Sequence, residues 1–188
     1  MTSLNVVVNP KRLELLRELK PDVKAVGLLV NPANPSVTEP TLALMQAAAR
    51  TLGLELHILQ ASADSDIEPV FARLTELGAG GLVIVSEPFF VSQGARLAAL
   101  ALRHHVPTIF YTREFVAAGG LASYGGDLTE SHRVCGRYAG RILKGEKPAD
   151  LPVQQVTRVE LIINLKSAQA LGIDVPRQLI ARADEVIE

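Results

Sequence analysis

The chain has 188 residues, of which 48% are hydrophobic and 21% charged, and its net charge is −1. This is the composition of a globular protein with a sizeable core, and it excludes an intrinsically disordered chain. The balanced charge offers no electrostatic basis for binding nucleic acid, and no apolar run is long enough to span a bilayer. We therefore expect neither a nucleic-acid partner nor insertion into a membrane.

Strands and helices alternate through the first 111 residues, and the short apolar strands between amphipathic helices favour parallel crossovers. Pro21, Gly53 and Gly78 mark the ends of three of the helices. The predicted elements are an apolar run at Leu4–Val8, a helix at 11–20, a strand at Ala25–Val30, a helix at Thr38–Leu52, a strand at Leu54–Leu59, a helix at 65–77, a strand at Gly81–Val85, a helix at Ser92–His104 and a strand at Thr108–Tyr111.

After Tyr111 this alternation becomes irregular, and a polar link containing proline lies at Lys144–Pro152. The predicted elements there are a short helix at Arg113–Ala118, a strand at Leu121–Tyr124, an amphipathic helix at Thr129–Leu143, strands at Val153–Val156 and Leu161–Ile163, and a last short helix at Leu165–Leu171. The fold class is therefore α/β, with a three-layer parallel sheet that carries helices on both faces.

Polar and aromatic residues follow the carboxyl ends of three predicted strands, where ligands bind in open α/β sheets. An Asn before Pro is usually turn chemistry, and a Phe after a strand can simply be core. The prediction of a ligand site therefore depends on the convergence of the three loops. The candidate ligand-binding residues are Asn31, Asn34, Ser86, Glu87, Phe89, Tyr111 and Arg113.

Catalytic and metal motifs are missing from the sequence: there is no G-x-S-x-G elbow, no H-E-x-x-H and no Cys-x-x-Cys. Ser86 beside Glu87 is the best nucleophile–base pair, and no motif places a histidine near it. His57 and His132 are predicted at the surface, and Cys135, the one cysteine, is predicted as a small buried side chain. We expect no enzyme, no metal and no cofactor. A phosphorelay receiver needs an acidic pair after its first strand and a phosphorylatable Asp after its third. The sequence has Asn31 and Ser86-Glu87 there, which argues against a receiver.

Five segments that together span nearly the whole chain are, in order, KRLELLRELKP, VGLLVNPANP, the run ending in SEPFF, PTIFYTREFVAAGGLASYG, and RILKGEKPADLPVQQVTRVELIINLKSAQALGIDVP. They resemble the corresponding segments of ABC-transporter substrate-binding proteins of the tryptophan/tyrosine type. The resemblance implies a periplasmic binding protein of the first structural type, with two α/β lobes that close on a small molecule delivered to an ABC permease. The N-terminus shows no signal-peptide pattern.

Side-chain chemistry and strand-end position suggest roles for four of the candidate residues: Phe89 and Tyr111 would stack on an aromatic or branched apolar side chain, Glu87 would meet an ammonium group and Arg113 a carboxylate. The resemblance implies domain boundaries. Residues 11–113 would form the second lobe and 151–188 would return to it. Residues 1–10 would be a crossover remnant of an absent first lobe, and 114–150 a crossing segment that normally packs on that lobe.

Without a first lobe, Leu4–Val8 and Leu121–Leu143 would be left uncovered. An exposed patch of Leu121, Val134, Tyr138 and Ile142 is rare in a soluble protein, so we expect a homodimer through 121–143, or this segment folded back on its own lobe. Half a cleft should bind ligand weakly or not at all. The alternative function is a cytoplasmic α/β sensor or regulatory domain that binds a small effector and dimerises; adjacent permease and ATPase genes would favour transport instead.

Overall fold

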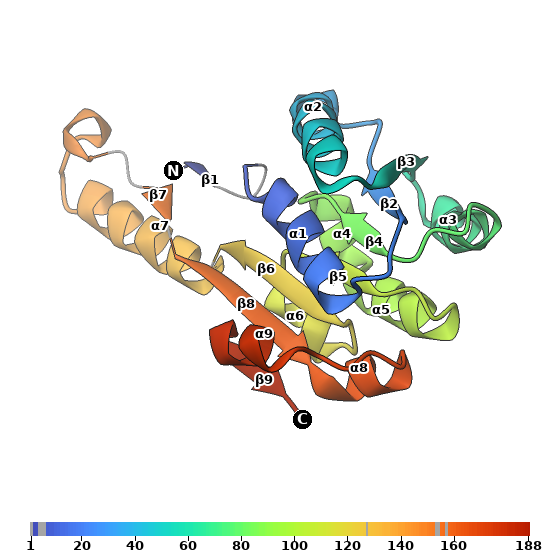
Figure 1. Cartoon of the computed structure of the whole chain (residues 1–188). Helices are drawn as coiled ribbons and strands as arrows, with labels where there is room; N and C mark the ends of the chain where they lie inside the picture. Colours follow the sequence, from blue (N-terminus) through green and yellow to red (C-terminus); the bar gives the residue numbers. More distant parts are fainter. Residues whose placement is uncertain (1, 4–6, 127, 153–154, 157) are drawn as a thin grey trace.

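The computed structural model describes residues 2–3, 7–126, 128–152, 155–156 and 158–188 (Figure 1). Its body is a sheet with the strand order β3-β2-β4-β5-β6-β8-β9, and β1 and β7 form a separate two-stranded sheet. The strands are β1 (Thr2–Ser3), β2 (Ala25–Val30), β3 (Glu55–Gln60), β4 (Leu82–Ile84), β5 (Thr108–Phe110), β6 (Ala122–Gly126), β7 (Gln155–Val156), β8 (Val159–Asn164) and β9 (Glu185–Ile187). The helices are α1 (Asn9–Leu19), α2 (Pro35–Leu52), α3 (Asp64–Glu76), α4 (Pro88–Ser92), α5 (Gly94–Arg103), α6 (Arg113–Ala117), α7 (Leu128–Leu143), the 3-10 turn Pro148–Asp150, α8 (Leu165–Ala170) and α9 (Arg177–Arg182).

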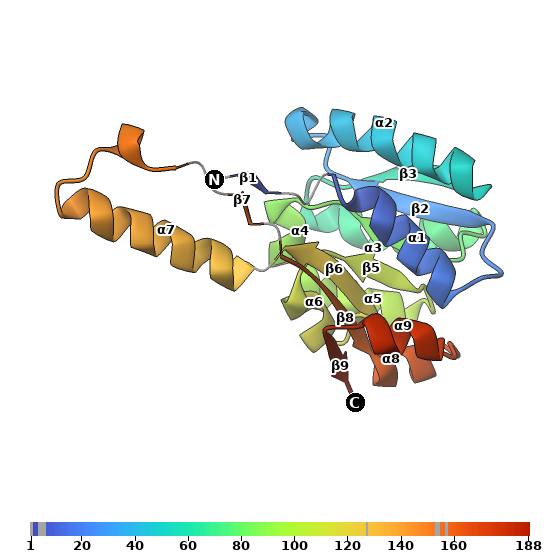
Figure 2. The ribbon, with the colours of Figure 1, turned by 60° about the vertical axis from the view of Figure 1, so that its left-hand side comes forward.

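The strands from β3 to β6 run parallel, whereas β8 is antiparallel to β6 and β9 is parallel to β8. Helices α1 and α2 lie on one face of the sheet, and α3, α5 and α6 lie on the other (Figure 2). The predicted three-layer α/β architecture is confirmed. The chain passes from β2 to β3 on one side and then to β4 on the other, so the strand order reverses at β2, which makes the space between β2 and β4 a topological switch point.

Strand β2 is buried from both faces, as its uninterrupted apolar sequence predicts. Val26, Leu28, Leu29 and Val30 are all 0% exposed. Gly27 has no room for a side chain, because a Cβ atom there would lie 2.4 Å from Leu74 Cδ2 of α3. The central strand is thus fixed between two layers of helices before its chain turns at Asn31.

The prediction that 121–143 lies outside this lobe is wrong for its first part. Strand β6 pairs with β5 on one side and with β8 on the other. Leu121 is 1% exposed, and α6 packs against β6 and β8. The apolar residues of this strand find their sheet within the described lobe, so no second lobe is needed to cover them.

Helix α7, in contrast, extends away from the body (Figures 1 and 2). Cys135 is exposed, which corrects the prediction of a buried side chain, because helical spacing does not reveal whether another layer covers a given face. Val134 is only 5% exposed, while Ile142 and Leu143 at the end of the helix are 41% and 88% exposed. Of the predicted run Leu4–Val8, residues 4–6 lie outside the described residues, as do 153 and 154 of Val153–Val156.

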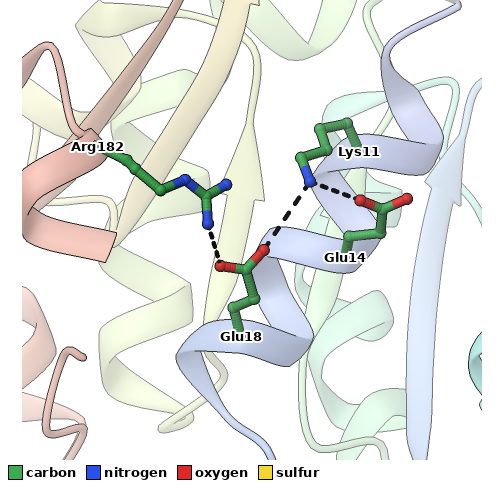
Figure 3. Close-up of polar contacts among 4 residues, drawn as sticks. All are labelled: Lys11, Glu14, Glu18 and Arg182. Carbon is green, nitrogen blue, oxygen red and sulfur yellow. Dashed lines mark hydrogen bonds and ion pairs between the residues drawn. The ribbon is translucent and has the colours of Figure 1, made fainter. Parts of the chain in front are cut away.

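A network of ion pairs joins α1 to α9, two elements far apart in the sequence (Figure 3). Arg182 Nη1 lies 2.7 Å from Glu18 Oε2, and Lys11 Nζ lies 3.9 Å from Glu18 Oε1 and 2.6 Å from Glu14 Oε2. Neither α9 nor β9 was predicted from the sequence. The network and the buried Leu179 hold this C-terminal segment on the body.

Replacing Glu18 with Gln should lower the free energy of unfolding by only about 0.2–1 kcal/mol, because partly exposed ion pairs are screened by solvent. The effect is measured by urea denaturation in a double-mutant cycle with Arg182→Gln. A coupling energy above about 2 kcal/mol would contradict this view of the network as a peripheral tie.

Candidate functional site

The loops after β2 and β4 leave the sheet side by side, at the switch point, and the loop after β5 leaves next to them. We call this strand-end edge the rim; it carries all seven predicted ligand-binding residues. The adjacency of β2, β4 and β5 thus brings the three loops to one edge, as the convergence argument requires. The local geometry of each residue differs, and it separates those with a structural role from those open to a ligand.

Asn31 organises the turn after β2. Its side-chain Oδ1 accepts a hydrogen bond from the Ala33 N–H at 3.0 Å, and its backbone oxygen accepts one from Thr38 Oγ1 at 2.7 Å. Asn34 precedes α2, where its Oδ1 accepts a hydrogen bond from Ser36 Oγ at 2.8 Å. The Asn-Pro chemistry therefore fixes the turn, and Asn31 is only 6% exposed.

Glu87 caps the short helix α4. Its Oε2 accepts a hydrogen bond from the Phe89 N–H at 2.7 Å, and the residue is 6% exposed. Phe89 is half-buried and lies 5.4 Å from the ring of Phe90, while Ser86 is also half-buried. The loop after β4 thus places a carboxylate and an aromatic ring together at the rim.

Tyr111 follows β5 and is half-buried, with its ring edge-on to Phe110 at 4.8 Å. Burial raises the pKa of its hydroxyl to about 12; the positive charge of Arg12 opposes this shift, and the negative charges of Glu87 and Glu114 add to it. The phenol is therefore neutral at physiological pH and can donate a hydrogen bond.

Arg113 is exposed and already bound to a carboxylate. Its Nε donates to Glu185 Oε2 of β9 at 2.9 Å, and hydrogen bonding and charge from Glu185 raise the pKa of the guanidinium. A ligand carboxylate would have to compete with Glu185 for this side chain. Arg113 thus ties the start of α6 to the last strand of the sheet.

Arg12 was missed by the sequence reasoning and lies 0% exposed at the start of α1. Its Nε donates to the Tyr124 backbone oxygen of β6 at 2.6 Å, and its guanidinium carbon lies 5.7 Å from the centre of the Tyr111 ring. Burial lowers the pKa of Arg12 to about 9, which leaves the group charged at neutral pH. The available signal was helical spacing, since Arg12 shares the apolar face of Leu16 and Leu19.

A chain of buried polar groups continues from Arg12 to α2. Arg12 Nη1 donates to Asn9 Oδ1, Asn9 Nδ2 donates to Thr41 Oγ1 at 3.4 Å, and Thr41 Oγ1 donates to the Val37 backbone oxygen at 2.7 Å. Asn9 and Thr41, like Arg12, are 0% exposed. The network connects the end of β6 with the first turns of α2, behind the rim.

A hollow lies elsewhere, along the outer edge of β3. It has a volume of about 640 Å³ and is lined by 56–60 together with Asp66 and Arg73 of α3. The Asp66 carboxylate already accepts backbone hydrogen bonds from Ser62 and Ala63, each at 2.9 Å. The rim is the better candidate, because it combines charged and aromatic groups from three neighbouring strand-end loops.

Within the described ranges, no group of His, Cys, Asp and Glu side chains is arranged to hold a metal ion. The same part of the chain contains no helix with the length and apolar character needed to cross a membrane. Neither observation adds to the chemistry of the rim, which rests on charges, aromatic rings and backbone groups.

The sheet with its switch-point rim is an open α/β lobe of the kind in which ligands bind at the carboxyl ends of the strands. The family model for ABC transporter substrate binding proteins matches residues 4–187, so the chain belongs to this family, and the resemblance predicted from the sequence is confirmed. A tyrosine-binding protein from Clostridioides difficile (strain R20291) is 25% identical over 161 residues, which are 86% of this chain and 46% of that protein.

Two solved structures are similar to this chain. An ABC domain in complex with L-Trp from Streptococcus pneumonia matches with a TM-score of 0.84 and 25% identity, over 95% of this chain and 60% of that one. A periplasmic binding protein/LacI transcriptional regulator from Alkaliphilus metalliredigens QYMF, complexed with D-xylulofuranose, has a TM-score of 0.59 over 84% of this chain and 61% of that one; at 12% identity it shows the fold alone. The chain thus spans about half to three fifths of the length of these relatives.

Gly125 supplies a direct test of the rim. A Cβ atom there would lie 2.1 Å from the Tyr111 backbone oxygen, so Gly125→Ala must displace one of the two strand ends. We expect a loss of about 1–3 kcal/mol in the free energy of unfolding, measured by urea denaturation.

Gly136→Ala in α7 is the matched control. Nothing lies within 4 Å of a Cβ atom at Gly136, so this change should be neutral or stabilise the protein slightly through helix propensity. Equal effects of the two substitutions would show that β6 does not approach Tyr111 as described.

Proposed function

We propose that the chain provides one wall of the ligand cleft of an ABC importer's substrate-binding protein, and that the ligand is an amino acid with an aromatic or branched apolar side chain. The observation that carries the proposal is the meeting of charged, polar and aromatic residues at the switch-point rim. Family membership supports the class of protein, and the named ligands of two relatives, tyrosine and L-Trp, support the class of ligand.

The rim offers groups for each part of such a ligand. Phe89 and Tyr111 are half-buried, so each keeps part of an aromatic ring open for stacking on the ligand side chain. Glu87 supplies a carboxylate for the ammonium group, and Asn31, Asn34 and Ser86 supply polar contacts beside it. Arg113 is the least suited of the candidate residues, because Glu185 already occupies it.

In the proposed cleft the ligand lies between two lobes, and 11–113 with the segment returning from 151 forms one of them. Strand β6, which the sequence reasoning placed elsewhere, is now included in this lobe. Export from the cytoplasm and delivery to an ABC permease follow from the proposed class. The rim binds without catalysing a reaction in this proposal. The alternative, a cytoplasmic sensor domain, is supported only by likeness of fold to a regulator.

Binding is tested by nuclear magnetic resonance titration of the chain with L-tryptophan, L-tyrosine and L-leucine. We expect shifts confined to residues at the rim and a dissociation constant well above about 1 µM, because a single wall leaves much of the ligand in water. An absence of shifts up to the solubility limit of all three ligands would contradict the proposal.

Glu87→Gln should weaken this binding by roughly 10- to 100-fold, because it removes the charge that meets the ammonium group while it keeps an acceptor for the Phe89 N–H. Glu68→Gln is the matched control, since Glu68 pairs on the surface with Arg103 and lies on α3, away from the strand ends. Equal affinities of the two variants would remove Glu87 from the site.

We further propose that α7 mediates a homodimer. Glu130 near the start of α7 already pairs with Arg137, and Arg141 towards its end pairs with Glu146, so the apolar end of the helix, not its charges, is what a second copy would cover. Ile142 and Leu143 are exposed and would be covered by the second copy. Residues 121–126 of the predicted interface are excluded, since they belong to the sheet.

Leu143→Asp should shift the protein from dimer to monomer in sedimentation-velocity experiments, because a charge would be buried at the interface. Leu44→Asp on α2 is the control, since Leu44 is 39% exposed and lies on a different surface. A wild-type protein that remains monomeric at all accessible concentrations would contradict the dimer.

A further inference from the structure

Arg12 is a buried cation without an anion. No ion pair joins it to a carboxylate within the described part of the chain, and its contacts with hydrogen-bond acceptors are the Tyr124 backbone oxygen and Asn9 Oδ1. Its second terminal nitrogen, Nη2, is buried and has no hydrogen-bond partner. Within the described ranges, by contrast, each arginine that contacts a carboxylate lies at the surface.

Such a group is costly. Buried guanidinium groups are normally paired with a carboxylate or fully hydrogen-bonded, and a donor left unsatisfied loses the hydrogen bond that water would have given it. The planar fork of an arginine matches a carboxylate, because two parallel N–H groups can reach its two oxygens. The free nitrogen of Arg12 is therefore suited to an acceptor that arrives from outside the lobe.

Arg12 also lies next to the rim. It touches the end of β6 through Tyr124 and faces the ring of Tyr111, so it lies directly behind the rim. Tyr111 is half-buried, with one part of its side chain against Arg12 and another open to solvent. The Tyr111 ring therefore lies between the rim and the guanidinium.

We propose that Arg12, rather than Arg113, receives the α-carboxylate of an amino-acid ligand, with Tyr111 as the side chain that moves to admit it. The inference rests on the proposed function and refines it. Glu87, whose charge also acts on Tyr111, supplies the opposite charge for the ammonium group, so the two ends of a zwitterion meet two buried groups of opposite sign. Ligands without a free carboxylate should bind poorly.

The test compares L-tryptophan with L-tryptophanamide, which lacks the carboxylate charge, by nuclear magnetic resonance titration. Wild-type protein should bind the acid at least about tenfold more tightly than the amide, the effect of one charge-assisted hydrogen bond. Arg12→Met should reduce this ratio to about one. Arg17→Met, which removes another guanidinium from the same helix, one that donates to the Leu52 backbone oxygen, should leave the ratio unchanged.

A second measurement is made on the wild-type protein, so it does not depend on whether Arg12→Met folds. The Nε–H resonance of Arg12, assigned by its loss in Arg12→Lys, should shift in the wild-type protein when the acid is added and stay in place when the amide is added. This readout decides the matter if Arg12→Met does not fold, because a purely structural arginine would not distinguish the two ligands.

The outcomes separate the two proposals. If wild-type protein prefers the acid and Arg12→Met keeps that preference, or if the Nε–H resonance responds equally to both ligands, the role of Arg12 is refuted and the binding function stands. If wild-type protein binds neither ligand, the proposed function is refuted and the role of Arg12 falls with it.

Discussion

The position of β2 between β3 and β4 is the constraint on which the rest of the lobe depends. Its side chains are buried by helices on both faces, so its register with the two neighbours is fixed by packing as well as by the hydrogen-bond ladder. Because the chain turns to opposite sides of β2, the loops after β2 and β4 meet at the switch point, where ligands bind in open α/β sheets. The proposed ligand site is thus a result of chain topology, and the side chains at the rim would determine what it binds.

The rim is supported from behind by a buried polar network. Arg12 joins α1 to the end of β6, and Asn9 and Thr41 continue the connection to α2. Hydrogen bonds of this kind hold the loops at fixed distances from one another, and a fixed arrangement lowers the cost of ordering them around a ligand. One donor of this network, Arg12 Nη2, has no acceptor, and its location behind the rim is the basis of the proposed recognition of a carboxylate.

Much of this could be predicted from the sequence, and the exceptions have physical reasons. Uninterrupted apolar runs such as Ala25–Val30 revealed the parallel strands, and strand-end position gave the candidate residues. The sequence pattern of a strand does not show which strands lie beside it, so Leu121–Tyr124 was assigned to an absent first lobe and not to the sheet of this one. Arg12 was overlooked because an arginine within a helix usually lies in water. Cys135 was expected to be buried because it lies in the middle of an amphipathic helix. Such a pattern does not show whether another layer of the protein covers a given face of the helix.

The antiparallel ladder between β6 and β8 extends to Gly126 and Val159 at the rim edge of the sheet. The chain therefore leaves the lobe towards α7 and re-enters it at the same place, on two strands that are bonded to each other. A displacement of α7 would act on β6 and β8 together, because the two strands are hydrogen-bonded to each other. On β6 it would reach the Tyr124 carbonyl, which accepts a hydrogen bond from Arg12. The Tyr124 carbonyl is therefore the point at which the strand that leads to α7 meets Arg12, the side chain that we propose to bind the ligand carboxylate.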